Sequence, residues 1–344
     1  MRAELHTTPD VFDRLKPEWD SLLDPGRSDN LYLCNDWQRI WWKHLHRGDL
    51  AVVSVRDDDG VLRGIGSWFI VDEAGQHVVH IVGCIDVTDY MDIIAQPGYE
   101  EAVHAALIDF MLSDDAPHWD CIRLCNIPEA SPTVDLFTRL ARARDLSVET
   151  PVQEVCPIIE LPATYEEYLA TVDKKQRHEL RRKRRRAEGA DVSWYVVGRE
   201  HDLDAEIDRF FDLMALSDDE KADFLKEPGH RDFFREMGHA MAERGLLELI
   251  FLTVDGQPAA TMWQFVYRDR MLLYNSGLNP TDFSALSPGI VLLTYSIEDA
   301  VERGLKIYDF LRGNEEYKYR MGAHDTRVYE ICVTRQPGAP GGVG

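Results

Sequence analysis

The segment Leu247–Asp269, LELIFLTVDGQPAATMWQFVYRD, contains two β-rich runs joined by a VDG turn. The chain continues with MLLYNSG over residues 271–277, a segment typical of a helix from Pro288 to Arg303, and KIYDFLRG over residues 306–313. This order predicts a hairpin, a third strand, a helix and a fourth strand. Strands that alternate with a helix are typical of an α/β domain.

The first half of the chain repeats this order. Residues 51–72, AVVSVRDDDGVLRGIGSWFIVD, contain two runs joined by a DDDG turn, and VVHIVG, a helix near residues 100–112 and the strand DCIRLCN follow. The sequence therefore predicts two α/β domains of common ancestry, residues 1–150 and residues 151–335, with a boundary near Thr150-Pro151. Residues 336–344 are rich in Gly and Pro, and we expect a disordered tail there.

Composition limits the classes of function. The 344 residues include 61 Asp and Glu against 38 Lys and Arg, a net charge of −23, and such a surface repels DNA and anionic lipid. The longest stretch without a charge, residues 283–297, is shorter than the roughly 20 residues of a membrane helix. The N-terminus shows no export signal. We therefore expect a cytoplasmic protein that does not insert into membranes, and six cysteines that are free thiols.

The segment Lys174–Arg186, KKQRHELRRKRRR, is the exception to this acidic composition, because nine of its thirteen residues are Lys or Arg. Good helix formers, with no Gly or Pro before Gly189, predict a helix. One interpretation is a solvated helix that pairs with acidic neighbours. The other is a surface that recognises a polyanion or a phosphorylated carrier, with Lys174, Arg177 and Arg181 as candidate substrate-binding residues.

The start of the second predicted helix, Ser287-Pro288-Gly289-Ile290, is a candidate anion site. Ser287 suits an N-cap, and Pro288 suits the first turn. That turn has no acidic side chain, so its amides and the helix dipole are available to an anion such as a pyrophosphate, and Gly289 allows a close approach. The alternative is a well-capped helix without a ligand. Because the equivalent turn of the first half contains two glutamates, we expect an anionic cosubstrate in the second half.

The segment Asp309–Gly322, DFLRGNEEYKYRMG, follows a strand that is predicted to be buried. Open α/β sheets place ligand sites at such strand ends, although structural ion pairs also occur there. His178-Glu179 lacks the second histidine of a zinc-protease helix, and the spacings of the cysteines and aspartates do not suit a metal either. We therefore expect no metal.

Several of these motifs together resemble bacterial acyltransferases of the GNAT superfamily, in the CelD-like, FemAB-related branch. They are the basic segment, the VDG hairpin with its QPAA, Leu286-Ser287-Pro288-Gly289, and above all YDFLRGNEEYKYRMG over residues 308–322. The resemblance is strongest over residues 173–322, and the first half looks like a degenerate GNAT domain. It implies two tandem GNAT-like domains, each with a mixed, mostly antiparallel sheet flanked by helices.

The resemblance also implies an acyl-CoA cosubstrate, usually acetyl-CoA, and transfer of the acyl group to an amine. The amine would belong to a small-molecule or carrier-linked acceptor, such as an amino sugar or a precursor of the cell envelope or of a polysaccharide. The pyrophosphate site of the family corresponds to Ser287, Pro288, Gly289 and Ile290. This segment has a single glycine and departs from the family's Gln/Arg-x-x-Gly-x-Gly/Ala loop.

Direct acyl transfer needs a deprotonated amine and a group that stabilises the developing oxyanion. Within the motif, we assign the cationic stabilisation to Lys318 and the removal of the proton to Asp309 or Glu315. Tyr317 or Tyr319 would return a proton to the thiolate.

Other interpretations stay open. Arg312 either fixes the acceptor or clamps the turn to a nearby carboxylate. FemX-type relatives extend peptidoglycan precursors from aminoacyl-tRNA instead of CoA and carry a lysine in a late Phe-Lys or Tyr-Lys motif, which Tyr317-Lys318 matches. The basic segment would then bind tRNA. A GNAT pair without activity, acting as a scaffold, is a third possibility. The acceptor, the acyl chain length and the oligomeric state do not follow from the sequence.

Overall fold

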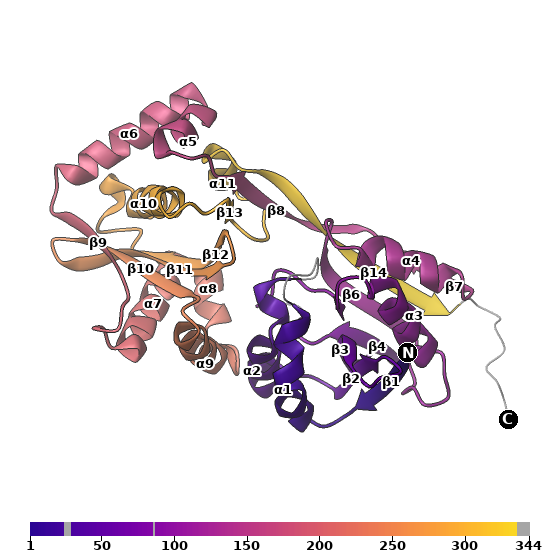
Figure 1. Ribbon diagram of the computed structural model, residues 1–344. Helices are drawn as coiled ribbons and strands as arrows, with labels where there is room; N and C mark the ends of the chain where they lie inside the picture. Colours follow the sequence, from indigo (N-terminus) through magenta and orange to yellow (C-terminus); the bar gives the residue numbers. More distant parts are fainter. Residues whose placement is uncertain (24–28, 85–86, 336–344) are drawn as a thin grey trace. The chain divides into compact units, whose positions relative to one another are not determined.

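The computed structural model describes residues 1–23, 29–84 and 87–335, which fall into two compact units (Figure 1). The first unit consists of Met1–Glu154 together with the segment that begins at Thr326, and the second consists of Val155–Asp325. The tail expected over residues 336–344 lies outside the described residues. None of the described helices is long and apolar enough to span a membrane.

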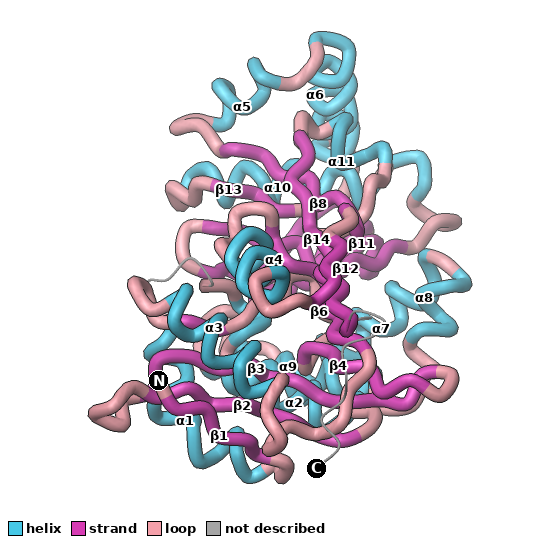
Figure 2. The backbone as a smooth tube through the Cα atoms, turned by 90° about the vertical axis from the view of Figure 1, so that its right-hand side faces the viewer, coloured by secondary structure: helices cyan, strands magenta, loops and turns pink. Residues whose placement is uncertain are grey.

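The first unit is built on a sheet with the strand order β1-β2-β3-β4-β6-β14, in which β7 pairs with β14 and β5 with β3. Helices α3 and α4 lie side by side, and α3 packs on the first strands (Figure 2). The strands are β1 (Arg2–His6), β2 (Asp49–Arg56), β3 (Leu62–Glu73), β4 (Gln76–Ile81), β5 (Ile94–Ala95), β6 (Cys121–Pro128), β7 (Leu146–Glu149) and β14 (His324–Arg335). The helices are α1 (Asp10–Leu22), α2 (Asn35–Leu45), α3 (Glu100–Met111) and α4 (Thr133–Arg142).

The second unit has the strand order β8-β13-β12-β11-β10-β9. Helices α6 and α10 lie on one side of this sheet, and α7 and α9 lie on the other (Figure 1). The strands are β8 (Val152–Glu160), β9 (Val192–Val196), β10 (Leu247–Val254), β11 (Gln257–Tyr267), β12 (Arg270–Leu278) and β13 (Ile307–Asp309). The helices are α5 (Tyr165–Thr171), α6 (Lys174–Glu188), α7 (Leu203–Ser217), α8 (Asp219–Phe224), α9 (His230–Glu243), α10 (Pro288–Glu302) and α11 (Glu316–Arg320).

The predicted repeat is present in both units. In the first, β2, β3 and β4 are antiparallel neighbours, and β6 then pairs parallel to β4 after helix α3. In the second, β10, β11 and β12 are antiparallel neighbours, and β13 pairs parallel to β12 after helix α10. The predicted α/β class is therefore confirmed, as are the helices at Lys174 and Pro288.

The parallel pair of the second unit diverges early. Strands β12 and β13 pair over three residues, from Arg270–Ile307 to Leu272–Asp309, whereas β12 itself continues to Leu278. The last residues of β12 therefore run beyond the short strand β13. This divergence produces the opening in which the candidate site lies.

A buried hydrogen-bond network fixes α10 on the sheet beside this opening. The amide of Gln264 in β11 donates to Ser296 of α10 at 2.7 Å and to the hydroxyl of Tyr308 in β13 at 2.6 Å. The hydroxyls of Ser296 and Tyr308 are themselves 2.9 Å apart. Since all three side chains are buried, the network holds the helix at a defined position above both strands.

The last strand, β14, does not lie in the domain to which the sequence assigned it. Residues 151–335 were expected in one domain, but most of β14 belongs to the first unit, where Val328 pairs with Pro128 and Thr334 with Cys121. Strand β7 pairs with the other side of β14. Because the last residues of β14 pair with β6 and β7, they are part of the first sheet.

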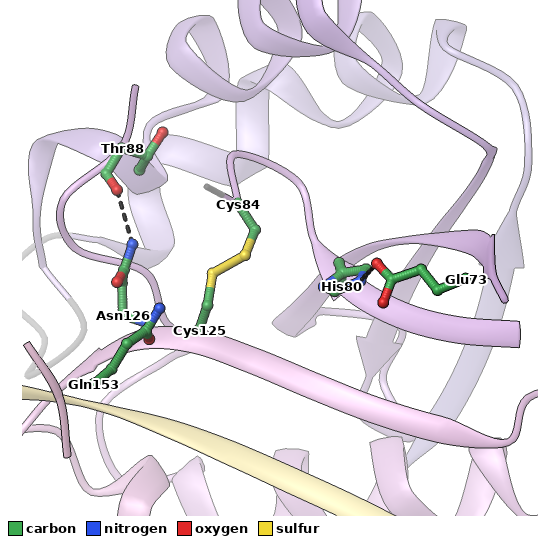
Figure 3. Close-up of a disulfide and its surroundings, with 7 residues drawn as sticks. All are labelled: Glu73, His80, Cys84, Thr88, Cys125, Asn126 and Gln153. Atoms are coloured by element: carbon green, nitrogen blue, oxygen red, sulfur yellow. Dashed lines mark hydrogen bonds and ion pairs between the residues drawn. A yellow bond between two sulfur atoms is a disulfide. The ribbon is translucent and has the colours of Figure 1, made fainter. Parts of the chain in front are cut away.

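A disulfide joins Cys84 and Cys125 in the first unit, so the expectation that all cysteines are free thiols is wrong for this pair (Figure 3). Cys84 follows β4 and Cys125 lies in β6, and these neighbouring parallel strands bring their Cα atoms to 6.4 Å. The next residue, Asn126, has φ 55° and donates from its side-chain amide to the carbonyl of Thr88 at 2.9 Å. The other four cysteines are free.

Candidate functional site

A pocket of about 400 Å³ opens in the second unit, where β12 runs beyond β13. Its apolar wall consists of Met262, Leu273, Leu278, Pro280, Ile290 and Leu293. Serines, Asn279 and the first turn of α10 supply polar groups, and none of the lining residues carries a carboxylate. A pocket of this kind suits a ligand with an apolar part and an anionic group at its helix end.

The structure brings two parts of the predicted site together in this pocket. Ser287, Pro288, Gly289 and Ile290, the expected pyrophosphate segment, line it, and so does Tyr317 from the late motif. If residue 289 carried a Cβ atom, that atom would lie 3.2 Å from the side chain of Leu278, so the glycine allows close packing at this wall.

The expected side-chain cap at Ser287 is wrong. Ser287 is the residue before the first helical turn, but it adopts the left-handed conformation with φ 53° and ψ 55°, and its side chain caps no amide. Its hydroxyl instead accepts a hydrogen bond from the ammonium of Lys183 at 2.8 Å. The first turn of α10 therefore begins without a side-chain cap, with a lysine beside it. This arrangement increases the capacity of the helix start to bind an anion.

Helix α6 reaches the start of α10 through one of its faces. Besides Lys183, Arg186 donates to the carbonyl of Ala285 at 2.9 Å, and Arg184 forms an ion pair with Glu298 of α10 at 2.7 Å. Lys183 and Arg186 thus hold the segment around the start of α10, and Arg184 binds further along that helix.

None of the predicted substrate-binding residues of α6 lines the pocket. Lys174 is exposed and Arg177 is partly exposed. Arg181 forms an ion pair with Glu166 at 2.6 Å, as the interpretation of a solvated helix with acidic neighbours predicts.

Tyr317 is the residue of the late motif that reaches the pocket. It lines the pocket, and its ring packs edge-on against Phe310 at 6.0 Å between centroids. Burial raises the pKa of Tyr317, and the neighbouring Glu315 carboxylate raises it further. The hydroxyl is protonated at neutral pH, as an ordinary tyrosine hydroxyl is, and the shift makes it a weaker acid.

Lys318 does not line the pocket. Its side chain is 2% exposed, and its ammonium donates to the carbonyls of Arg312 at 2.8 Å and Gly313 at 3.0 Å. It also forms an ion pair with Glu315 at 2.9 Å. These contacts hold the loop that precedes α11. They suit a residue that positions the loop better than one that contacts a reacting carbonyl, so the structure does not support the role expected from the sequence.

The other predicted residues of the late motif also lie outside the pocket lining. Asp309 is fully buried, accepts a hydrogen bond from the amide of Leu311 at 2.8 Å, and lies 4.0 Å from Arg270. Arg312 is partly exposed. The Glu315 side chain is 56% exposed. Of the two candidate bases, Glu315 is therefore the one that solvent and an acceptor can reach.

Two lysines near the pocket were missed by the sequence reasoning. Lys183 belongs to the basic segment, and a helical projection could have identified it, because Leu180 and Ala187 mark the buried face and Lys183 lies beside that face. Lys221 of α8 donates to the carbonyl of the pocket residue Ser276 at 2.6 Å. Burial lowers the pKa of Lys221, and nearby carboxylates partly oppose this shift. No local sequence signal pointed to Lys221.

Comparisons with known proteins agree with this geometry. Residues 174–319 match the family model of the acetyltransferase (GNAT) domain. Among solved structures, the chain is similar to FemX, with a TM-score of 0.66 and 12% identity over 96% of this chain and 97% of that one. No curated protein matches the sequence.

Two further solved structures share the fold. One is the C-terminal domain of a putative lysylphosphatidylglycerol synthetase from Agrobacterium fabrum, with a TM-score of 0.56 and 11% identity over 95% of this chain and 92% of that one. The other is a tandem GNAT protein from the clavulanic acid biosynthesis pathway, with a TM-score of 0.50 and 12% identity over 98% of this chain and 100% of that one. Residues 174–319 therefore form a GNAT domain, and the predicted tandem GNAT-like fold is confirmed.

Proposed function

We propose that this protein, an N-acyltransferase of the GNAT superfamily, binds an acyl-CoA thioester, in the first instance acetyl-CoA, in the pocket of its second unit and transfers the acyl group to an amine. One observation carries the proposal. The uncapped, carboxylate-free start of α10, the ammonium of Lys183 and the protonated hydroxyl of Tyr317 meet around one pocket.

The start of α10 suits the diphosphate of CoA. The amides of Gly289 and Ile290 lie in the first turn of a 15-residue helix, and Lys183 adds a full positive charge beside them. Oriented amides and a nearby cation are the usual means of binding a diphosphate. The absence of acidic residues from the pocket lining removes the competing negative charge.

The end of β12 suits the extended arm that connects the diphosphate to the thioester. Residues Leu273, Ser276, Gly277 and Leu278 line the pocket where β12 runs beyond β13. A strand edge offers backbone donors and acceptors to the amides of an extended ligand, as when a peptide adds to a sheet. The apolar side chains opposite bury the methylene groups of that arm.

The chemistry at the reacting end needs one proton removed and one returned. Glu315 accepts the proton from the attacking amine, directly or through a water, and Tyr317 returns a proton to the thiolate that leaves. Lys318 holds the loop between these residues and β13 through its contacts with carbonyls 312 and 313. Arg312, on the same loop, binds the acceptor, which is a small-molecule or carrier-linked amine such as an amino sugar or an envelope precursor.

Isothermal titration of the full chain with acetyl-CoA tests the proposal. The variant Gly289→Glu places a carboxylate in the first turn of α10, and the flexible Leu278 side chain can move to accommodate it. We expect saturable binding by the parent and loss of binding by this variant. The matched control, Ala102→Glu, adds the same charge at an exposed position of α3 and should bind like the parent. If the parent does not bind acetyl-CoA, the proposal fails.

Aminoacyl-tRNA is the second candidate donor, and two observations favour it. The fold is shared with FemX, and the outer face of α6 exposes Lys174, Lys175 and Arg185. A mobility-shift assay with charged and uncharged tRNA, at two salt concentrations, distinguishes the two donors. Binding of tRNA without binding of acetyl-CoA would favour the aminoacyl donor. Failure of both would favour the scaffold interpretation.

A further inference from the structure

The first unit gathers two histidines and an aspartate at one end of its sheet. Strands β4 and β6 are parallel neighbours, and Val78 pairs with Cys121. The residues immediately before this pair are His77 and Asp120, so they lie at the same end of the sheet. His118 lies two residues before Asp120 in the loop that leads into β6.

The backbone holds two of these three residues in place. The amide of Asp120 donates to the carbonyl of His77 at 2.9 Å, and the amide of His77 donates to the Asp120 carboxylate at 2.8 Å. The carboxylate therefore has a fixed position relative to β4.

Both imidazoles turn a ring nitrogen toward this carboxylate. His77 Nδ1 lies 3.5 Å from Asp120 Oδ2, and His118 Nε2 lies 3.4 Å from Asp120 Oδ1. One donor atom from each of the three side chains lies within 4.8 Å of the others. Two ligand atoms that each lie about 2.1 Å from a tetrahedral ion are about 3.4 Å apart, so each histidine lies at ligand spacing from one carboxylate oxygen, His77 from Oδ2 and His118 from Oδ1. The donor nitrogens of His77 and His118 lie within 4.8 Å of each other, and they must come closer for both to bind one ion.

We propose that His77, His118 and Asp120 form a surface site for a divalent transition-metal ion with the ligand preference of Zn²⁺. Two imidazoles and a carboxylate are ligands that Zn²⁺ accepts, and water completes the coordination because the side chains are partly open to solvent. Among the described residues, this is the one group of three His, Cys, Asp or Glu side chains with donor atoms this close. A bound ion fastens the loop between α3 and β6 to strand β4.

The alternative is a pair of histidine–aspartate ion pairs without a metal. His239 offers a matched comparison, because it lies 3.0 Å from Asp204, and the other partner of that carboxylate is Arg235 rather than a second histidine. If ion pairing alone explained the arrangement, neither place would bind Zn²⁺ specifically.

Isothermal titration of the metal-free full chain with Zn²⁺ tests the site. We expect one equivalent to bind to the parent, and His118→Gln and Asp120→Asn to weaken that binding at least about tenfold, since each removes or weakens one of three ligands. His118 is 70% exposed, so its replacement should leave the fold intact. The control His239→Gln, which removes a histidine of the second unit, should bind like the parent.

Hydrogen exchange gives a second measurement that does not depend on stoichiometry. Zn²⁺ should slow the exchange of amides 112–120 in the parent but not in His118→Gln, because only the complete site fastens the loop. The proposal is overturned if the parent shows no saturable binding up to about 1 mM Zn²⁺. It is also overturned if His118→Gln and Asp120→Asn bind Zn²⁺ as tightly as the parent.

Discussion

Replacement of Lys183 by Gln should weaken the binding of CoA while leaving the pocket in place. The ammonium of Lys183 lies 2.8 Å from the hydroxyl of Ser287, and Ser287 lines the pocket at the start of α10. A glutamine keeps much of the length and the hydrogen-bonding capacity of the side chain but removes its charge. The interaction that is lost is therefore the attraction to a bound diphosphate.

The expected magnitude follows from the exposure of the lysine. A hydrogen bond to a charged group contributes about 1.5–3 kcal/mol. Because Lys183 is partly exposed, solvent screens its charge, and we take the lower end of that range, about 1.5 kcal/mol. This free energy corresponds to a dissociation constant about tenfold higher.

Titration calorimetry with two ligands separates this effect from a general change in the protein. CoA carries the diphosphate, whereas acetyl-pantetheine lacks it, so Lys183→Gln should weaken the binding of CoA and leave that of acetyl-pantetheine unchanged. The matched control is Lys175→Gln, which removes the same charge from an exposed position of the same helix. We expect the control to change CoA binding by less than about threefold, because exposed charges at a distance are screened.

Two results would refute this reasoning. If Lys183→Gln and Lys175→Gln weakened CoA binding equally, the effect would come from the overall charge of α6 rather than from a contact at α10. If Lys183→Gln weakened the binding of CoA and of acetyl-pantetheine equally, the lysine would stabilise the pocket instead of binding the diphosphate.

Three further predictions concern residues that support the fold. Lys318→Met leaves the carbonyls of the 311–313 loop without their cation. We expect the free energy of unfolding, measured in urea, to fall by about 3 kcal/mol. Unchanged stability would contradict the positioning role. Burial lowers the pKa of His104 to about 4, so between pH 6.5 and 4 the unfolded chain binds a proton that the folded chain does not. Stability should fall by about 3 kcal/mol over this window as the pH drops, and His104→Gln should lack this contribution; identical pH profiles would show that His104 does not cause it. Cys84→Ser opens a loop with a sequence separation of 41 and should lower the stability of the first unit by about 4 kcal/mol; an unchanged melting temperature would contradict this estimate.

The sequence predicted the repeated architecture because its signals are local. The VDG and DDDG turns, the β-rich runs beside them and the Pro288 helix start each depend on residues close in the chain, and each is present in the structure. The position of β14 did not follow from such signals, because its partners β6 and β7 come from the first half of the chain. A strand that pairs across so long a separation carries no local sign of its partner.

In the candidate site, too, some features follow from local sequence signals and others depend on tertiary contacts. The segment 287–290 and Tyr317 were named from the sequence, and both line the pocket. The role expected for Lys318 came from its place in a motif, but the direction of its side chain, toward carbonyls 312 and 313, depends on how the loop folds back. Lys221 reaches the pocket from α8 through a contact with Ser276 that no spacing predicts.

By itself, the sequence determined the elements, their repeated order, the acidic surface with one basic helix, and a helix start without carboxylates. Those properties arise from residue type and from neighbours within a few positions. Tertiary structure alone decided which face of α6 meets α10, where β12 and β13 diverge, that Cys84 joins Cys125, and that His77, His118 and Asp120 meet at one sheet end. These contacts join segments far apart in the chain, and only the packing of the sheets and helices brings such segments together.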